Sequence, residues 1–335
     1  MESFIKSRET RPQLIQTLLA ALPPLDPSLE EFRDVATLPD GYKIDLQIVR
    51  HRGVNEINGG KPLIILWPGG GFIVAGVEPT TRPAREFALE FDAVVVNATY
   101  RLAPEHKFPQ AVMDGWETAQ WLAKNARRYG AKGFVIGGWS AGGNISAVVA
   151  QRSAVEGLGI TGVMLGIPLI FSKDIVPEKY ASEWTSREDN ATWSETFTTD
   201  VIESVKHAYD ADVRSKWYSP INDPEAIPKS PKAYIHVGDR DPLRDDGLIY
   251  AKVLQDNGVE VRVDNYLDWG HQGWTVFAPK EVPADLAPPW QDPKAGKGSL
   301  SHGRHGKNKG RSSSGGISGN TGGNTGGGGG GGNKK

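Results

Sequence analysis

Short apolar runs alternate with helical stretches along most of the chain. Residues 63–67, 93–98 and 134–138 are continuous apolar runs, the pattern of strands that are buried on both faces. Between them, apolar residues recur at helical spacing over 81–91 and 111–129. An alternation of strands and helices predicts a mostly parallel sheet with helices on both faces, the α/β class.

The flanking segments extend this pattern. Residues 42–49 alternate between apolar and polar positions, as expected for a half-exposed strand. Further strands are predicted at 163–170, 232–238 and 259–266, and further helices at 143–152 and 247–257. The first forty residues, with several prolines, are interpreted as helix that packs over the core. The long segment 172–217 lacks strand character and predicts helices inserted between two strands.

The C-terminal end has a different composition. From Asp292 onward the chain consists mainly of Gly, Ser, Asn and Lys, with an unbroken glycine run at 326–332. Such a segment cannot bury enough apolar surface to offset its ordering entropy. We therefore predict one folded domain over residues 1–290 and a disordered, Gly-rich basic tail over residues 291–335.

Charge and cysteine content exclude several kinds of protein. Eight Lys and Arg residues against one acid give the part from Asp292 onward a charge of +7 and leave −9 on the rest. An acidic folded body argues against nucleic acid as a partner. The absence of cysteine excludes disulfides and thiolate catalysis. No stretch reaches the roughly 18 apolar residues that a membrane span needs, and the N-terminus lacks a signal-peptide pattern, so we predict a cytoplasmic protein.

One serine occupies a position typical of a nucleophile. Residues 138–142 read Gly-Trp-Ser-Ala-Gly, a G-x-S-x-G pattern that follows a predicted buried strand and precedes a predicted helix. This context indicates a sharp strand-to-helix turn with Ser140 at its apex and small residues where backbones approach closely. The alternative is a glycine-rich turn that carries an incidental serine.

Three consecutive glycines, 69–71, directly follow another buried strand in the segment Trp-Pro-Gly-Gly-Gly-Phe. Backbone N–H groups in such a loop can stabilise the oxyanion of acyl transfer. A serine nucleophile also needs a base and an acid that orients the base. Among seven histidines, His271 follows the last predicted strand, where a loop can carry it toward the strand ends. The acid should come from 239–245, which contains Asp239, Asp241 and Asp245.

Four segments together resemble the hormone-sensitive-lipase-like carboxylesterases of the α/β-hydrolase fold. They are Pro-Gly-Gly-Gly-Phe at 68–72, Tyr-Arg-Leu-Ala-Pro-Glu-His at 100–106, Ser-Ala-Gly-Gly-Asn at 140–144, and Asp-Pro-Leu-Arg-Asp at 241–245 followed by His271. The resemblance implies an eight-stranded, mostly parallel sheet with a helical cap from about 1–40 and 172–217. It also implies a serine hydrolase that cleaves carboxylic esters through an acyl-enzyme.

The resemblance assigns roles to individual residues. It implies a catalytic triad of Ser140, Asp241 and His271, and an oxyanion hole formed by the backbone of Gly70, Gly71 and Ala141. The aromatic side chains near these positions predict an apolar substrate pocket lined by Trp67, Phe72 and Trp139. This chemistry needs no metal and no cofactor. The partner is a small-molecule ester, and a homodimer is compatible with the sequence.

Two departures keep other functions open. Pro68 stands where the family has a histidine before the three glycines, and Trp139 stands before the serine where a small or acidic residue is common. An enzyme for a specialised metabolite, such as a lactone or polyketide ester, is one alternative, because fold and triad do not fix the substrate. A non-catalytic small-molecule receptor on the same fold is the other.

Overall fold

The computed structural model describes residues 15–16, 19–20, 22–55, 57, 60–192 and 197–271. All of these lie in the first of the two units into which the chain divides, Met1–Gly296. The predicted tail, 291–335, lies outside the described residues, so both the tail and the boundary at 290 stay predictions.

The described residues form one eight-stranded sheet in the order β1-β2-β4-β3-β5-β6-β7-β8. Only the pairs β1/β2 and β2/β4 are antiparallel, and the other neighbours are parallel. The sheet therefore confirms the predicted α/β-hydrolase fold class. The strands are β1 (Leu29–Thr37), β2 (Lys43–His51), β3 (Lys61–Trp67), β4 (Val94–Ala98), β5 (Ala131–Trp139), β6 (Ile160–Gly166), β7 (Lys232–Gly238) and β8 (Val261–Tyr266).

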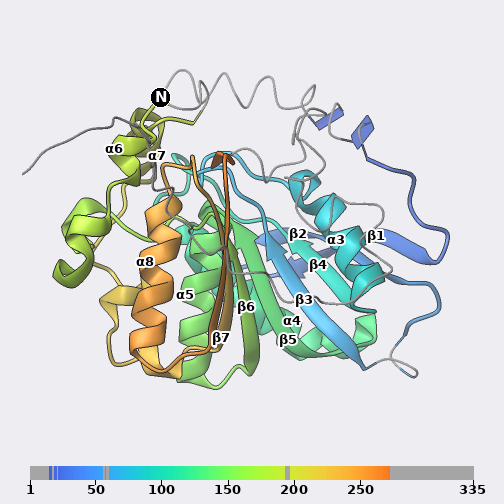
Figure 1. The fold of residues 1–335 in the computed structure, drawn as a ribbon. Coiled ribbons are helices and arrows are strands. Elements are labelled where there is room, and N and C mark those ends of the chain that lie inside the picture. Colours follow the sequence, from blue (N-terminus) through green and yellow to red (C-terminus); the bar gives the residue numbers. More distant parts are fainter. Residues whose placement is uncertain are drawn as a thin grey trace, which may run out of the picture. The chain divides into compact units, whose positions relative to one another are not determined.

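Helices cover both faces of the sheet (Figure 1). Alternate residues of β3 show the two layers: Leu63 and Ile65 pack in a cluster with residues of α4, α5 and α8, whereas Ile64 and Leu66 pack with residues of α3. Strands buried on both faces read as continuous apolar runs, which is why these strands were predictable. The covering helices are α3 (Glu78–Glu90), α4 (Gln110–Asn125) with the 3₁₀ turn η1 (Ala126–Tyr129), α5 (Ala141–Glu156) and α8 (Arg244–Asp256).

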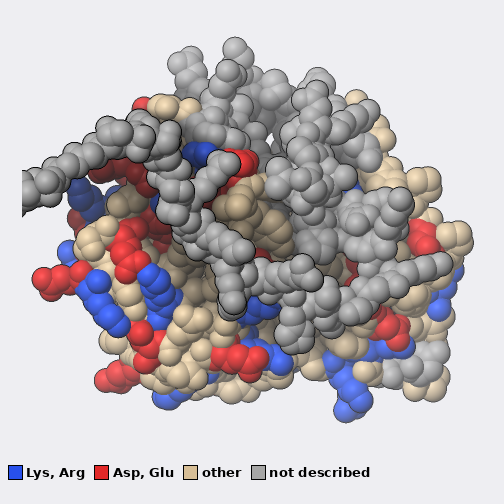
Figure 2. All heavy atoms as spheres, viewed as in Figure 1, with Lys and Arg blue, Asp and Glu red and all other residues tan. Residues whose placement is uncertain are grey.

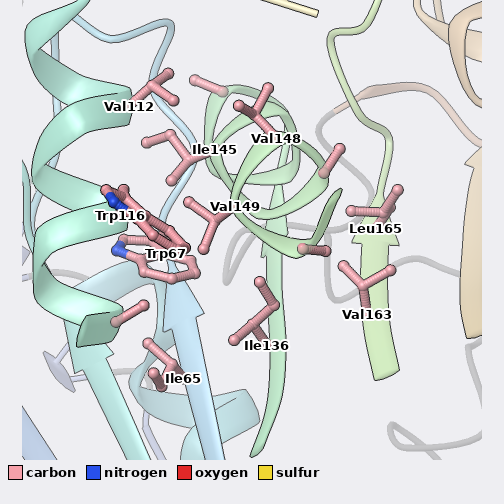
Figure 3. Close-up of a cluster of buried hydrophobic side chains, with 14 of the residues drawn as sticks. Ile65, Trp67, Val112, Trp116, Ile136, Ile145, Val148, Val149, Val163 and Leu165 are labelled. Carbon is pink, nitrogen blue, oxygen red and sulfur yellow. The ribbon is translucent and has the colours of Figure 1, made fainter. Parts of the chain in front are cut away.

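The larger core cluster lies between β3, β5 and β6 on one side and α4 and α5 on the other (Figure 3). Trp67, at the end of β3, is fully buried there and points toward Trp116 of α4. Ile145, Val148 and Val149 of α5 close the same layer, as Figure 3 shows. The helix that begins at the predicted nucleophile is therefore fixed to the central strands by its apolar residues.

The segment between β6 and β7 is helical, as predicted for 172–217. It contains α7 (Thr199–Tyr209), the single-turn helix α6 (Ser186–Asp189) and short 3₁₀ turns at η2 (Lys173–Ile175), η3 (Glu178–Glu183), η4 (Pro220–Asn222) and η5 (Ile227–Lys229). We call the part from η2 to α7 the insertion. In Figure 1, α6 and α7 lie beyond the upper ends of the strands. That the insertion acts as a cap over substrate stays a prediction.

The prediction that the first forty residues are helical is wrong for residues 29–37. These residues form β1, an edge strand that pairs with β2 over nine residue pairs from Leu29↔His51 to Thr37↔Lys43. Leu29, Phe32 and Val35 recur at every third position, a spacing that imitates a helix. Pairing with a distant strand overrides this local pattern.

The predicted strand at 163–170 also ends earlier, at Gly166. Ile167 takes a positive φ of 40°, and Pro168 has no N–H to contribute to a ladder. The chain then turns toward the predicted nucleophile, where the Leu169 N–H donates to the Ser140 carbonyl oxygen at 3.3 Å. The early end of β6 thus places residues 167–171 beside the candidate site.

The described surface carries both signs of charge. On the face in Figure 2, Lys and Arg side chains are interspersed with Asp and Glu side chains. That nucleic acid is not a partner stays a prediction. Within the described residues, no helix is both long enough and apolar enough to cross a bilayer.

Candidate active site

Ser140 sits at a strained turn between β5 and α5. Its φ of 54° and ψ of −117° lie outside the regions that non-glycine residues normally occupy. Both glycines of the motif are sterically required: a Cβ on Gly138 would lie 2.4 Å from the Gly142 carbonyl oxygen, and a Cβ on Gly142 would lie 2.1 Å from that of Trp67. The motif therefore keeps its predicted strand-turn-helix context.

The structure brings the three predicted triad side chains together. The His271 Nε2 atom lies 3.0 Å from Ser140 Oγ, and the His271 Nδ1 atom lies 2.8 Å from Asp241 Oδ2. Asp241 is fully buried, and Ser140 and His271 are both about 7% exposed. Asp239, the neighbouring alternative, is partly exposed and pairs with Arg240. The contact with His271 thus selects Asp241 among the three candidate acids.

The loop that carries Asp241 is held on two sides. The Leu243 N–H donates to Asp241 Oδ1 at 2.8 Å. From the insertion, the Asn190 side-chain amide donates to the carbonyl oxygens of Asp239 and Asp241, each at 3.1 Å. One carboxylate oxygen of Asp241 therefore faces the backbone and the other faces His271, which fixes the direction of the acid.

The glycine loop lies against the serine turn. A Cβ on Gly69 would lie 3.3 Å from the Ser140 Cβ, and a Cβ on Gly70 would lie only 1.6 Å from the Val74 carbonyl oxygen. Gly70 and Gly71 both have positive φ. Within the described residues their N–H groups have no hydrogen-bond acceptor, and Ala141, the first residue of α5, has none inside its helix. That these three N–H groups form an oxyanion hole stays a prediction.

Pro68 is held by a residue of the second family segment. The Tyr100 hydroxyl donates to the Pro68 carbonyl oxygen at 2.9 Å, in a buried position. The next residue, Arg101, forms a buried ion pair with Asp114, which also accepts the Arg101 backbone N–H. The hydrogen bond with the Asp114 carboxylate raises the pKa of the Arg101 guanidinium above its ordinary value. The hydrogen bond from Tyr100 thus holds the glycine loop at Pro68, the position where the family has a histidine.

A small cavity of about 20 Å³ lies between the insertion and the glycine loop. Phe72 lines it and stacks on Tyr209 of α7 with ring centroids 4.0 Å apart. Val205 of α7 comes so close that a Cβ on Gly71 would lie 2.9 Å from it. The remaining lining residues are mainly apolar or aromatic: Leu169, Phe171, Ser172, Trp184, Arg187, Ile202, Glu203, Lys206 and Tyr218.

Two predicted pocket residues do not line this cavity. The prediction for Trp67 is wrong, because its side chain is fully buried in the core beneath the loop (Figure 3). Trp139 packs on the opposite face of the sheet, in the cluster that contains Ile167 and Trp269. A Cβ on Gly166 would lie 2.4 Å from the Trp139 ring. Strands buried on both faces carry apolar residues everywhere, so the sequence did not indicate which way these rings point.

Sequence reasoning missed residues of the insertion that touch the site. Phe197 stacks on the His271 ring, with centroids 3.6 Å apart and an interplanar angle of 7°. Val205 and Tyr209 of α7 were also missed. The insertion was predicted as a unit, but no local pattern identified which of its side chains turn inward. Among the described residues, no cluster of His, Asp and Glu side chains could hold a metal ion.

Comparisons with known proteins agree with this geometry. A family model described as the alpha/beta hydrolase fold matches residues 64–275. Esterase LipI of Mycobacterium tuberculosis is 32% identical over 247 residues, which covers 67% of this chain and 69% of that protein. This chain belongs to the α/β-hydrolase family. Within it, the chain is a member of the hormone-sensitive-lipase-like carboxylesterases.

Further members of the α/β-hydrolase family show similar coverage. Versiconal hemiacetal acetate esterase of Dothistroma septosporum is 28% identical to this chain over 265 residues. The match covers 77% of this chain and 79% of that protein. The crystal structure of the Pyrobaculum calidifontis esterase superimposes with a TM-score of 0.70 at 28% identity, covering 81% of this chain and 86% of that one. The residues 64–275 that the family model matches include Ser140, Asp241 and His271.

Proposed function

We propose that this α/β-hydrolase cleaves carboxylic esters through Ser140, His271 and Asp241. His271 Nε2 accepts the proton of Ser140 Oγ while that oxygen attacks the ester carbonyl carbon. Asp241 keeps the other ring proton on Nδ1 and stabilises the imidazolium that forms. The contacts of 3.0 Å and 2.8 Å between these side chains carry the proposal.

The next steps return the enzyme to its starting state. The imidazolium donates its proton to the leaving alkoxide, and the alcohol departs from an acyl-enzyme on Ser140. Water then attacks the acyl carbonyl while His271 again accepts a proton, and the carboxylic acid leaves. The backbone N–H groups of Gly70, Gly71 and Ala141 stabilise the oxyanion in both halves, and one such donor is typically worth about a hundredfold in rate.

We propose that the preferred acyl group is short. Phe72 directly follows the glycine loop and stacks on Tyr209 of α7, so α7 leaves little space beside that loop. A short acyl group such as acetyl needs little rearrangement of this contact, whereas a long chain requires α7 to move. The name of one relative, versiconal hemiacetal acetate esterase, describes an acetate ester, which supports the same choice.

Hydrolysis of p-nitrophenyl acetate, butyrate and octanoate by the wild-type protein and by Ser140→Ala tests the proposal. We expect turnover of the acetate by the wild type, a lower kcat/KM for the octanoate, and no turnover by the variant. A wild type that is inactive on all three esters and that a fluorophosphonate does not label at Ser140 contradicts the proposed mechanism. That result would favour the receptor alternative.

A further inference from the structure

Phe197 of the insertion covers one face of the His271 ring. The two ring centroids are 3.6 Å apart and the planes are inclined by 7°, so the rings lie almost directly above one another. Phe197 is partly buried and packs against the main core cluster. The His271 ring makes hydrogen bonds with Ser140 and Asp241 through its two nitrogen atoms. Its face contacts the Phe197 ring, which comes from the insertion.

This stacking geometry suits a charged imidazole better than a neutral one. Two neutral aromatic rings prefer offset or edge-to-face contacts, because their quadrupoles repel when they lie face to face. A cation above the face of an aromatic ring is instead attracted to it. In the proposed mechanism, His271 gains a positive charge when it accepts the Ser140 proton. The contact thus favours the state that lies close to the transition state.

The backbone that follows Phe197 is held in place. Thr198 caps α7, since its hydroxyl accepts the Val201 N–H at 3.3 Å. The Thr199 hydroxyl donates to the Arg187 carbonyl oxygen at 2.5 Å, and the Arg187 guanidinium forms a buried ion pair with Asp246. The chain that follows Phe197 is therefore anchored to the first turn of α7 and to Arg187 of the insertion.

The same segment also holds the acid. Asn190, seven residues before Phe197, donates to the carbonyl oxygens of Asp239 and Asp241. The Thr199 N–H, two residues after Phe197, donates to the carbonyl oxygen of Ala191, the residue after Asn190, at 3.3 Å. Among the described residues, the insertion therefore links the Asp241 carboxylate and the Phe197 ring, which both contact His271. Asp241 therefore holds the edge of the His271 imidazole through Nδ1, and Phe197 contacts its face.

We propose that Phe197 is a positioning residue that fixes the plane of the His271 ring and stabilises its protonated form during catalysis. The inference rests on the proposed function, because it concerns the base of that mechanism. Cation–π contacts of this kind correspond to rate factors between about twofold and thirtyfold. Because the charge exists only in the transition state and the intermediates, the contact raises kcat and leaves KM almost unchanged.

The test compares Phe197→Leu and Phe197→Met, which remove the aromatic face, with Phe197→Tyr and Phe197→Trp, which keep one. We expect the first pair to lose between about two- and thirtyfold in kcat on p-nitrophenyl acetate, with KM changed by less than about twofold. At least one of the aromatic variants should restore kcat to nearly the wild-type value. Phe91→Leu, the same type of change at an exposed position of the α3 end, is the matched control and should behave as wild type.

Several results would overturn the inference. If Phe197→Leu and Phe197→Met keep the wild-type kcat, the aromatic face has no role. If they raise KM at unchanged kcat, Phe197 binds substrate instead of positioning the base. If all four variants lose kcat equally while their circular dichroism spectra and Tm match the wild type, the shape of the phenyl ring matters and its charge distribution does not. A wild type without esterase activity or fluorophosphonate labelling refutes the proposed function itself and the role of Phe197 with it.

Discussion

Replacing Asp246 by alanine should destabilise the whole fold. This carboxylate is fully buried at the start of α8 and accepts the N–H groups of Ile170 and Phe171, each at 2.9 Å, and the indole N–H of Trp184 at 3.0 Å. It also pairs with the Arg187 guanidinium at 3.0 Å. Burial raises the pKa of the Asp246 carboxyl in spite of Arg187, which shows how strongly the site is shielded from water.

The magnitude follows from what the substitution leaves behind. Asp246→Ala removes the partner of the Arg187 guanidinium, whose side chain is only about 8% exposed, and leaves two backbone N–H groups without their acceptor. Breaking a buried ion pair by removing one partner typically costs about 3–5 kcal/mol. For a domain of this size, 1 kcal/mol corresponds to about 2–4 °C in Tm. We therefore expect Tm to fall by about 6–20 °C.

Differential scanning calorimetry of the wild type and the variant measures this directly. Glu156→Ala is the matched control, because Glu156 forms a surface ion pair with Arg152 and its removal should leave Tm almost unchanged. Activity at 25 °C should also fall in Asp246→Ala, since Arg187 anchors the segment that carries Phe197. A drop in Tm no larger than that of Glu156→Ala would refute the reasoning that this ion pair is a buried anchor.

Three further results are expected. Tyr100→Phe removes the hydroxyl that holds the Pro68 carbonyl, so the free energy of unfolding should fall by about 0.5–1.5 kcal/mol and kcat should fall with it; an unchanged kcat would mean that the loop does not depend on this bond. Gly142→Ala forces a Cβ to within 2.1 Å of the Trp67 carbonyl and should lower kcat/KM by about a hundredfold; wild-type kinetics would contradict the fit. Burial lowers the pKa of His236 from 6.5 to about 3, so the unfolded chain binds the proton first and stability falls as pH decreases below 6.5. Urea unfolding at pH 7 and pH 5 should differ by about 2 kcal/mol more in the wild type than in His236→Gln, and equal differences would refute this.

Much of the fold follows from local sequence patterns. The central strands β3, β4 and β5 are continuous apolar runs, and the helix α4 repeats apolar residues at helical spacing. The helix α5 is buried at most of its positions. The strand β1 was missed because it lies at the edge of the sheet and forms by pairing with β2. The residues of β1 alone do not indicate this pairing. Cross-strand contacts such as Arg50–Glu30 contribute to that pairing.

The candidate site divides along the same line. The amino-acid sequence by itself determined the turn around Ser140, because glycines at 138 and 142 and a strand-helix context are local requirements of that geometry. The family resemblance chose Asp241 as the acid, and the tertiary structure places its carboxylate 2.8 Å from His271 Nδ1. Only the tertiary structure placed Trp67 in the core and Phe197 on His271. Those contacts join segments that are far apart along the chain. Their geometry is set by how the sheet, the covering helices and the insertion pack together, and no short stretch of residues encodes that.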